Sequence, residues 1–387
     1  MRSKAVIVGI GRTEYSRGSG RTTLAMGAAA ARAALADAGL DPARVDGVAT
    51  YAIGDSSPGP AVAHAAGIDG LHFNLELLGG GNFATSVVTH AAMAIEAGMC
   101  DAVVCFRSLN GRSGYRYGRA DGRGDGGGAA MQVGGERQFA APHGYLTPPQ
   151  WLALWARQHM HRYGTTCEDL GQIAVTQRAH AAANAHAVQR KPITLEDYQS
   201  GRWINEPFRV FDCALEVDGA VAVVLTTEER ARDLRQKPIA ILGHAEFTGH
   251  GGSMDQWPDY TTMYSVEAGP RLWARAGVSP QDMDIACMYD CFTYTVMVTL
   301  EEFGICERGQ VGRYFAEGRA SYGGDVVVNP HGGLLSEGYI HGLNHTFEAV
   351  LQLRGQAGAR QVADARLALV TAGAGPFGGG MVLAGGL

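Results

Sequence analysis

Residues Asn329 to Gly342, NPHGGLLSEGYIHG, carry the strongest indication of both architecture and chemistry in this chain. They form a glycine-rich turn that runs into a helix, and near its end Tyr339 is followed by Ile340. An aromatic side chain inside a glycine-rich turn has little packing reason to be there. We therefore treat Tyr339 as a candidate functional residue.

The turn belongs to a pattern that occurs twice. At Gly332 the chain enters a helix through Asn344 and Glu348, and an earlier turn at Gly79 enters a helix of its own. Three further segment pairs match in the same order: KAVIVGIGRTEY from Lys4 with KPIAILGHAEF from Lys237, 34–51 with 272–290, and 102–106 with 366–371. A repeat of this kind predicts a duplicated α/β unit, with halves at 1–235 and 236–387.

Apolar runs alternate with helical patterns, which predicts parallel strands covered by helices. The expected strands of the first half are Lys4 to Gly9, Val45 to Tyr51 and Ala102 to Phe106. Its expected helices are Thr22 to Gly39, which ends at a glycine typical of a C-cap, and Thr85 to Gly98. A long insertion separates the halves at about 110–209. Its glycine- and arginine-rich beginning is either functional or disordered, and helices follow from Pro148 and around 170–186.

Composition excludes several classes of protein. A chain of 387 residues with 46% hydrophobic and 18% charged residues is an ordinary globular protein, too long for one small core. The net charge of -6 gives no general attraction to nucleic acid or membranes, and no apolar run is long enough to span a bilayer. The seven cysteines never form a CxxC pair and no secretory signal precedes the first strand, so we expect a cytoplasmic protein with reduced thiols.

At this point the chain resembles the thiolase superfamily, in the branch named after sterol-carrier-protein thiolases and lipid-transfer-protein homologues. The resemblance covers essentially the whole chain. It rests on the first strand, the segment MYDCFTYTVMVTLEEFGIC (288–306), the turn at 329–342 and the tail LVTAGAGPFGGGMVLAGG. It implies an α/β thiolase fold: two similar βαβαβαββ halves in a five-layer αβαβα sandwich, with an inserted loop domain.

The departures from the family pattern are specific. Thiolases hold the acyl group on a cysteine thiolate, which should sit where the first-half turn enters its helix, but GGGNFATS (79–86) contains no cysteine. The second cysteine is missing from TAGAGPFGGG (371–380). Tyr339 stands in place of the catalytic histidine, and Tyr289 precedes Asp290 in the segment that normally presents an asparagine. The chain is therefore not an ordinary thiolase.

A retro-aldol reaction fits what remains. If the β carbon of an acyl thioester carries a hydroxyl, removing its proton breaks the carbon–carbon bond and leaves a ketone and a thioester enolate, without a nucleophile. The reaction needs a base, an acid and a stabilised oxyanion. We assign the base to Tyr339 and the acid to Tyr289, or the reverse. His331, His341 and His345 flank Tyr339 and could tune it. Asp290 and Asn344 are further supporting candidates, and backbone N–H groups at Gly332, Gly333, Gly378 and Gly379 could face the oxyanion.

The closest resemblance is to lipid-transfer-protein-like aldolases of bacterial steroid side-chain degradation, which share the Tyr-Ile-His-Gly context. It implies cleavage of a 17-hydroxy steroid with a C22-type CoA thioester side chain to a 17-ketosteroid and propionyl-CoA. CoA enters as substrate, no cofactor is bound covalently, and no metal is expected. It also implies a homodimer carrying a small partner of the DUF35 type, with an OB fold and a zinc-ribbon segment, as a heterotetramer.

Two other interpretations stay open: a catalytically silent CoA- or lipid-binding subunit, and a thiolase that borrows its nucleophile from elsewhere. Arginines at 107, 112, 116, 119 and 123 suit CoA phosphates or a merely solvated loop. The Gly9 G-x-G stretch lacks the third glycine of a dinucleotide site. Cys287 and Cys291 are better explained as reduced cysteines than as metal ligands, and surface or core positions suit His159, His161 and His180.

Overall fold

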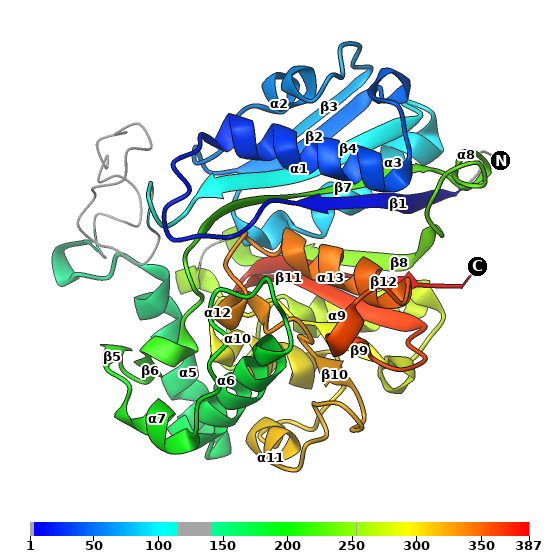
Figure 1. Ribbon diagram of the computed structural model, residues 1–387. Helices are drawn as coiled ribbons and strands as arrows, with labels where there is room; N and C mark the ends of the chain where they lie inside the picture. Colours follow the sequence, from blue (N-terminus) through cyan, green and yellow to red (C-terminus); the bar gives the residue numbers. More distant parts are fainter. Residues whose placement is uncertain (1–3, 115, 117–138, 140, 253, 387) are drawn as a thin grey trace.

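The computed structural model describes residues 4–114, 116, 139, 141–252 and 254–386. Two halves of similar construction lie one above the other in Figure 1, and the elements of the insertion lie beside the second half. Both termini lie on the same side of the molecule.

The first half is a five-stranded sheet in the order β3-β2-β4-β7-β1, in which β2 runs parallel to β3 and β4, and β7 runs antiparallel to β4 and β1. Its elements are β1 (Ala5–Arg12), α1 (Thr23–Ala38), β2 (Gly47–Ala52), α2 (Gly59–Ala65), β3 (Phe73–Leu78), α3 (Ser86–Ala97), β4 (Ala102–Asn110) and β7 (Asp218–Thr227). The expected helix boundaries are confirmed, because the Thr22 hydroxyl caps α1 and Gly39 ends it at φ 70°.

The second half repeats this order as β10-β9-β11-β12-β8. Its main elements are β8 (Ile239–Thr248), α9 (Ser265–Ala276), β9 (Ile285–Cys287), α10 (Thr293–Glu302), α11 (Val311–Ala316), β10 (Val327–Val328), α12 (Gly333–Ser336), α13 (Leu343–Leu353), β11 (Leu367–Ala374) and β12 (Phe377–Ala384). Strand β1 also pairs with β8, so the two sheets join edge to edge. The same strand order in both halves confirms the duplication expected from the repeat.

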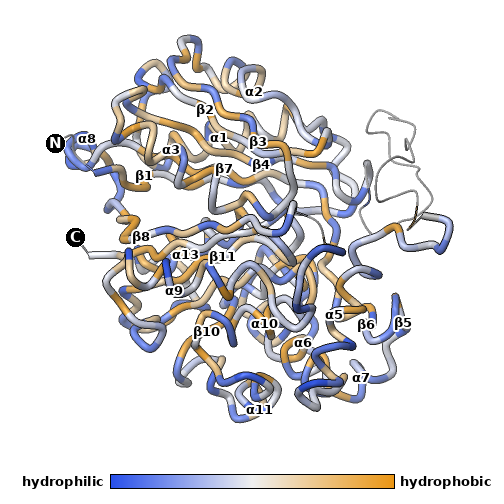
Figure 2. Tube along the Cα trace, turned by 180° about the vertical axis from the view of Figure 1, so that it is seen from behind, coloured by the Kyte–Doolittle hydropathy of each residue, from blue (hydrophilic) through white to orange (hydrophobic). Residues whose placement is uncertain are grey.

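Three helical layers alternate with the two sheets. Helices α1 and α2 cover the outer face of the first sheet, α3 and α13 lie between the sheets, and α9 and α10 cover the second. The central core joins Val88 of α3, Val350 of α13 and inward-facing strand residues of both halves. Hydrophobic segments follow the strands through the middle of the molecule in Figure 2. This is the predicted five-layer thiolase fold.

The insertion contributes α5 (Pro148–Tyr163), α6 (Cys167–Ala182), α7 (Leu195–Ser200), β5 (Trp203–Asn205) and β6 (Phe208–Arg209). Two helices in this region were expected, and α5 and α6 confirm them. Most of the glycine- and arginine-rich segment, including Arg119 and Arg123, lies outside the described residues. Among the residues that are described, every helix is too short or too polar to span a lipid bilayer.

One sequence expectation needs correction. The helix after Gly332 does not run unbroken through Asn344 and Glu348. It stops as α12 at Ser336, and α13 begins only at Leu343. Between them Gly338, His341 and Gly342 all have positive φ, which breaks the helix and places Tyr339 in an irregular loop.

Candidate active site

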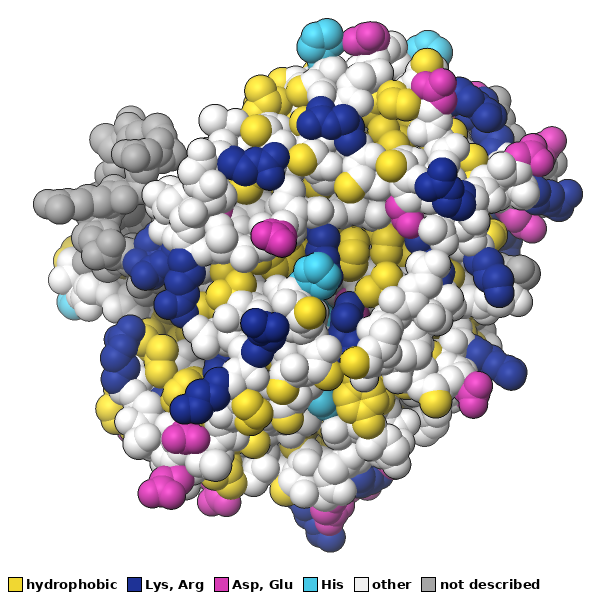
Figure 3. All heavy atoms as spheres, in the orientation of Figure 1, with side chains coloured by type: hydrophobic (Ala, Val, Ile, Leu, Met, Phe, Trp, Pro, Cys, Tyr) yellow, Lys and Arg dark blue, Asp and Glu magenta, His cyan; other side chains and the backbone are white. Residues whose placement is uncertain are grey.

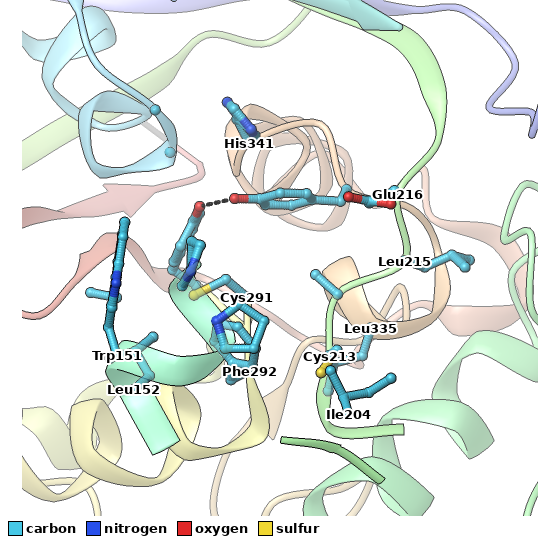
Figure 4. A pocket seen from close by; sticks show the side chains of 18 of the residues that line it. Trp151, Leu152, Ile204, Cys213, Leu215, Glu216, Cys291, Phe292, Leu335 and His341 are labelled. Atoms are coloured by element: carbon cyan, nitrogen blue, oxygen red, sulfur yellow. Dashed lines mark hydrogen bonds between the residues drawn. The ribbon is translucent and has the colours of Figure 1, made fainter. Parts of the chain in front are cut away.

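Tyr289 and Tyr339 meet at the wall of the main pocket, which has a volume of about 1060 Å³. Their hydroxyl oxygens are 2.9 Å apart and form the hydrogen bond drawn as a dashed line in Figure 4. Tyr289 follows β9, and its N–H donates to the Thr371 hydroxyl at 2.9 Å. The N–H of Tyr339 donates to the Leu215 carbonyl at 2.9 Å. Two residues 50 positions apart in the sequence thus form one hydroxyl pair.

The ring of Tyr289 is surrounded by small residues. A side chain added at Gly81 would collide with its hydroxyl, and one added at Gly342 would approach its ring to 2.9 Å. Gly81 comes from the turn that enters the first-half helix, and Gly342 comes from the turn before α13. Both glycine turns therefore leave room for the phenol.

Both phenols are held in the neutral form. Burial raises the pKa of Tyr289 well above its ordinary value, and repulsion from Tyr339 and Cys291 raises it further. Burial likewise raises the pKa of Tyr339, although the hydrogen bond from Tyr289 and the charge of Arg107 act in the opposite direction. Near neutral pH the pair therefore consists of two protonated hydroxyls that can exchange protons with each other.

His341 is the only one of the candidate histidines that lines the pocket. Its ring centroid lies 4.7 Å from that of Tyr339, and Figure 4 shows it near the hydrogen-bonded pair. Nδ1 of His341 is 2.9 Å from a guanidinium nitrogen of Arg107, which also forms an ion pair with Asp55. Burial and the Arg107 charge lower the pKa of His341 to about 3.

The other supporting candidates lie behind the pocket wall. Asp290 accepts hydrogen bonds from the N–H groups of Leu334 and Leu335 and so caps α12. Nε2 of His345 lies 3.1 Å from Asp290 Oδ1. Asn344 donates to Glu337 at 2.9 Å, and His331 is fully buried with Nε2 3.9 Å from the same carboxylate. These residues hold the turn that carries Tyr339 and do not line the pocket.

The glycines expected to serve an oxyanion do not line the pocket either. The N–H of Gly332 is donated to the Asn329 carbonyl. Gly378 and Gly379 lie within β12, paired to β11 on one side and β8 on the other. Gly333 packs against the Asp290 carboxylate. These four glycines are therefore accounted for by the packing of strands and turns. The glycines that line the pocket are Gly80, Gly81, Gly252 and Gly373.

The remaining pocket wall is apolar with arginines around it. Trp151, Leu152 and Ile204 come from the insertion, and Phe292 and Leu335 come from the second half. The lining arginines are Arg17, Arg112, Arg116, Arg178 and Arg202. In Figure 3 several Lys and Arg side chains lie close together at the left of the view. Such a wall suits a large apolar group joined to an anionic one.

Neither pocket cysteine resembles an activated nucleophile. Burial raises the pKa of Cys291 to about 12, and burial beside Asp212 raises the pKa of Cys213 well above its ordinary value. A reactive cysteine needs a depressed pKa instead. The raised pKa values of these two cysteines therefore speak against a thiolase that borrows its nucleophile.

Comparisons with known proteins show the family of this chain. The thiolase C-terminal domain-like family model matches residues 248–383. A 17-hydroxy-3-oxo-4-pregnene-20-carboxyl-CoA lyase of Mycobacterium tuberculosis is 43% identical over 98% of this chain and 99% of its own length. A steroid side-chain-cleaving aldolase of Thermomonospora curvata is 42% identical over 98% of this chain and 97% of its own. The chain belongs to the aldolase branch of the thiolase superfamily.

The solved structures give the same relationship. The aldolase superposes with a TM-score of 0.90 on a structure described as Ltp2-ChsH2(DUF35) aldolase, which is 41% identical and covers 99% of this chain and 98% of that one. Human mitochondrial 3-ketoacyl-CoA thiolase in complex with CoA, at 15% identity, covers 100% of this chain and 98% of that one with a TM-score of 0.70, and shows the shared fold alone. The protein is thus a carbon–carbon lyase built on a thiolase scaffold.

Several features of the aldolase site were not evident from its sequence. Asp55 and Glu216 were not singled out, and Arg107 was considered only as a ligand of CoA phosphates or as part of a solvated loop. Glu216 forms an ion pair with Arg116 at 2.6 Å on the pocket wall. The one available signal was a charged residue, Arg107, within an otherwise apolar strand, where a buried charge requires a partner.

Among the described residues no cluster of three His, Cys, Asp or Glu side chains is arranged to hold a metal ion, and His159 and His180 are buried with hydrogen-bond partners.

Proposed function

We propose that the aldolase cleaves a 17-hydroxy steroid with a C22-type CoA thioester side chain to a 17-ketosteroid and propionyl-CoA. The observation that carries this proposal is the 2.9 Å hydrogen bond between Tyr289 and Tyr339 inside a large, mainly apolar pocket. The names of the two relatives that are more than 40% identical support the steroid CoA thioester as the substrate.

The hydroxyl pair can move a proton without an ionised intermediate. Tyr339 accepts the proton of the substrate hydroxyl as it passes its own proton to Tyr289, and in the same step Tyr289 gives its proton to the α carbon. The bond between the α and β carbons breaks, its electron pair remains on the thioester side, and the β carbon becomes a ketone. Both tyrosines end as neutral phenols, which agrees with the raised pKa of each. The two roles can be exchanged without altering this balance.

The arginines of the pocket suit the CoA part of the substrate, because guanidinium groups bind phosphates with two parallel hydrogen bonds. The apolar residues from the insertion suit the steroid rings. The relative described as Ltp2-ChsH2(DUF35) aldolase supports a DUF35-type partner for this chain as well. An OB-fold partner of this type, with a zinc-ribbon segment, completes the proposed assembly.

We also propose a homodimer, joined through the first half. Strand β3 is at the edge of its sheet, and it lies beside an apolar hollow lined by Phe73, Leu75, Met93 and Met99. Met93 and Met99 are 45% and 57% exposed. An edge strand next to exposed apolar side chains is a surface that proteins usually cover. Two copies joined in this way, each with one partner subunit, make a heterotetramer.

The test is turnover of the steroid CoA thioester, followed by chromatography of the ketone and of propionyl-CoA. The wild-type protein, with its DUF35-type partner, should release both products in equal amounts. Tyr289→Phe and Tyr339→Phe should each lower kcat by about 10²–10⁴-fold. Tyr294→Phe is the matched control, because Tyr294 is also buried but its hydroxyl donates to the Tyr260 carbonyl outside the pocket. Unaltered turnover in both pocket variants would show that the tyrosines have no catalytic role.

A further inference from the structure

Arg107 reaches the active site of the aldolase from the opposite half of the molecule. It lies in β4, its side chain is fully buried, and it forms an ion pair with Asp55. Its guanidinium nitrogen is 2.9 Å from Nδ1 of His341. Tyr51 of β2 donates to the His341 carbonyl at 2.7 Å. Two side chains of the first half therefore hold one residue of the second-half turn that carries Tyr339.

The contact with Arg107 determines which ring nitrogen of His341 carries the proton. A guanidinium group has donors only, so Nδ1 of His341 must accept the hydrogen bond. The imidazole is then neutral and carries its proton on Nε2. The pKa of His341, lowered to about 3 by burial and by Arg107, agrees with this state. The backbone of His341 is also constrained, because its φ of 50° is unusual for a residue with a side chain.

A neutral ring at this place has a chemical consequence. An imidazolium is a stronger acid than a phenol, and its ring would lie 4.7 Å from that of Tyr339. It would donate its proton to the substrate oxygen or to the Tyr339 oxygen, and so oppose the transfer of the substrate proton to Tyr339. A neutral imidazole leaves the two phenols as the acid and base of the site.

We propose that Arg107, held by Asp55, is a positioning residue for the retro-aldol reaction: it keeps His341 neutral and in place against Tyr339. The proposal rests on the proposed function of the hydroxyl pair. It gives the buried ion pair of the first half a role in the chemistry of the second half.

The described charged and titratable groups that face His341 are Asp55 on the loop after β2, Arg107 on β4, Tyr51 on β2 and Tyr339 on its own turn. Arg107 lowers the pKa of His341 and Asp55 raises it. Replacing Arg107 with an uncharged residue leaves the Asp55 carboxylate as the dominant charge. The pKa of His341 should then rise, so that the ring becomes protonated as the pH falls.

The first variant to test is Arg107→Met, with kcat and KM measured between pH 5 and pH 9. We expect kcat to fall about 10²-fold, because a misplaced reacting group costs this much, and KM to change less than about threefold. We also expect an additional loss of kcat on the acidic side that the wild-type enzyme does not show. A kcat within threefold of wild type, or a profile with the wild-type shape, would overturn the proposal.

Two further variants separate charge from packing. Arg107→Lys restores the positive charge, so it should recover part of kcat and abolish the acidic loss. The double variant Asp55→Asn/Arg107→Met removes the remaining carboxylate, so it should abolish the acidic loss while kcat stays low. Arg354→Met is the matched control: Arg354 is equally buried and pairs with Asp37 at 2.8 Å, but away from the pocket. It should leave the shape of the pH profile unchanged.

A measurement without substrate keeps the inference testable if Arg107→Met does not fold or if the proposed function is wrong. In ¹⁵N NMR of the histidine-labelled wild-type enzyme, the His341 signals, assigned by their loss in His341→Gln, should show a protonated Nε2 and an unprotonated Nδ1 from pH 5 to pH 9. A proton on Nδ1, or titration within that range, would refute the inference by itself. The expected spectrum together with no turnover of the steroid thioester would instead mean that only the proposed function has failed.

Discussion

The hydroxyl of Tyr289 occupies the space that a side chain on Gly81 would need. Gly81 begins the short helical turn Gly81–Phe83, which leads towards α3, while Tyr289 follows β9 in the other half. This is the turn where thiolases carry their nucleophilic cysteine. The absence of a side chain at Gly81 in one half therefore leaves room for a phenol supplied by the other.

Gly81→Ala tests this relationship directly. The added methyl group should displace the Tyr289 hydroxyl and break its hydrogen bond to Tyr339. Because proton transfer requires close alignment, we expect kcat to fall about 10²-fold. Steady-state kinetics with the steroid CoA thioester is the measurement. Gly70→Ala serves as the control, since a methyl group there meets no atom within 4 Å. Equal kcat values for the two variants would contradict the close fit.

The pH dependence of kcat distinguishes a proton relay between two neutral hydroxyls from a mechanism that needs an ionised tyrosine as the base. A phenol whose pKa is raised above 10 is less than about 10⁻³ ionised at pH 7. Both hydroxyls of the pair have raised pKa values. If the reaction needed a preformed phenolate, kcat would rise about tenfold per pH unit throughout pH 6–9. The relay moves protons between neutral hydroxyls, so we expect kcat to vary less than about twofold over this range, as measured by initial rates in a constant-ionic-strength buffer.

Much of the fold could be predicted from the sequence because it occurs twice. Apolar runs and the paired turns at Gly79 and Gly332 indicate the duplication. Tyr339 stands out as an aromatic residue in a glycine-rich turn, and Tyr289 is identified by its place in the segment that resembles the thiolases. The polar network could not be predicted in the same way. Arg107 meets His341 across 234 positions, and only the packing of one half on the other brings them together. The glycines are a related case, since a turn's sequence does not reveal whether its N–H groups are already paired, as that of Gly332 is.

The arginines that line the pocket lead to a prediction about binding of the CoA phosphates. Arg112 and Arg202 belong to the insertion, and both line the pocket. If they bind the phosphates of the substrate, Arg112→Gln and Arg202→Gln should each raise KM about 10-fold, because a hydrogen bond to a charged group contributes about 1.5–3 kcal/mol. The kcat should stay within about threefold, since neither side chain touches the hydroxyl pair. Arg313→Gln is the control, because Arg313 is exposed on α11 and pairs with Glu317. A lowered kcat with unchanged KM would point to a role in the chemistry instead.

The exposed edge of the first sheet leads to a prediction about the proposed homodimer. Met93 of α3 is 45% exposed and lines the apolar hollow beside β3. In the proposed homodimer this side chain is buried, and a carboxylate in its place would lose its water without gaining a partner. Met93→Glu should therefore weaken the dimer at least about 10²-fold, as measured by analytical ultracentrifugation over a range of concentrations. Val266→Glu places the same charge on an apolar residue of similar exposure, on α9 of the other half. It should leave the dimer intact, and a Met93→Glu protein that sediments as the wild type does would exclude this face as the dimer interface.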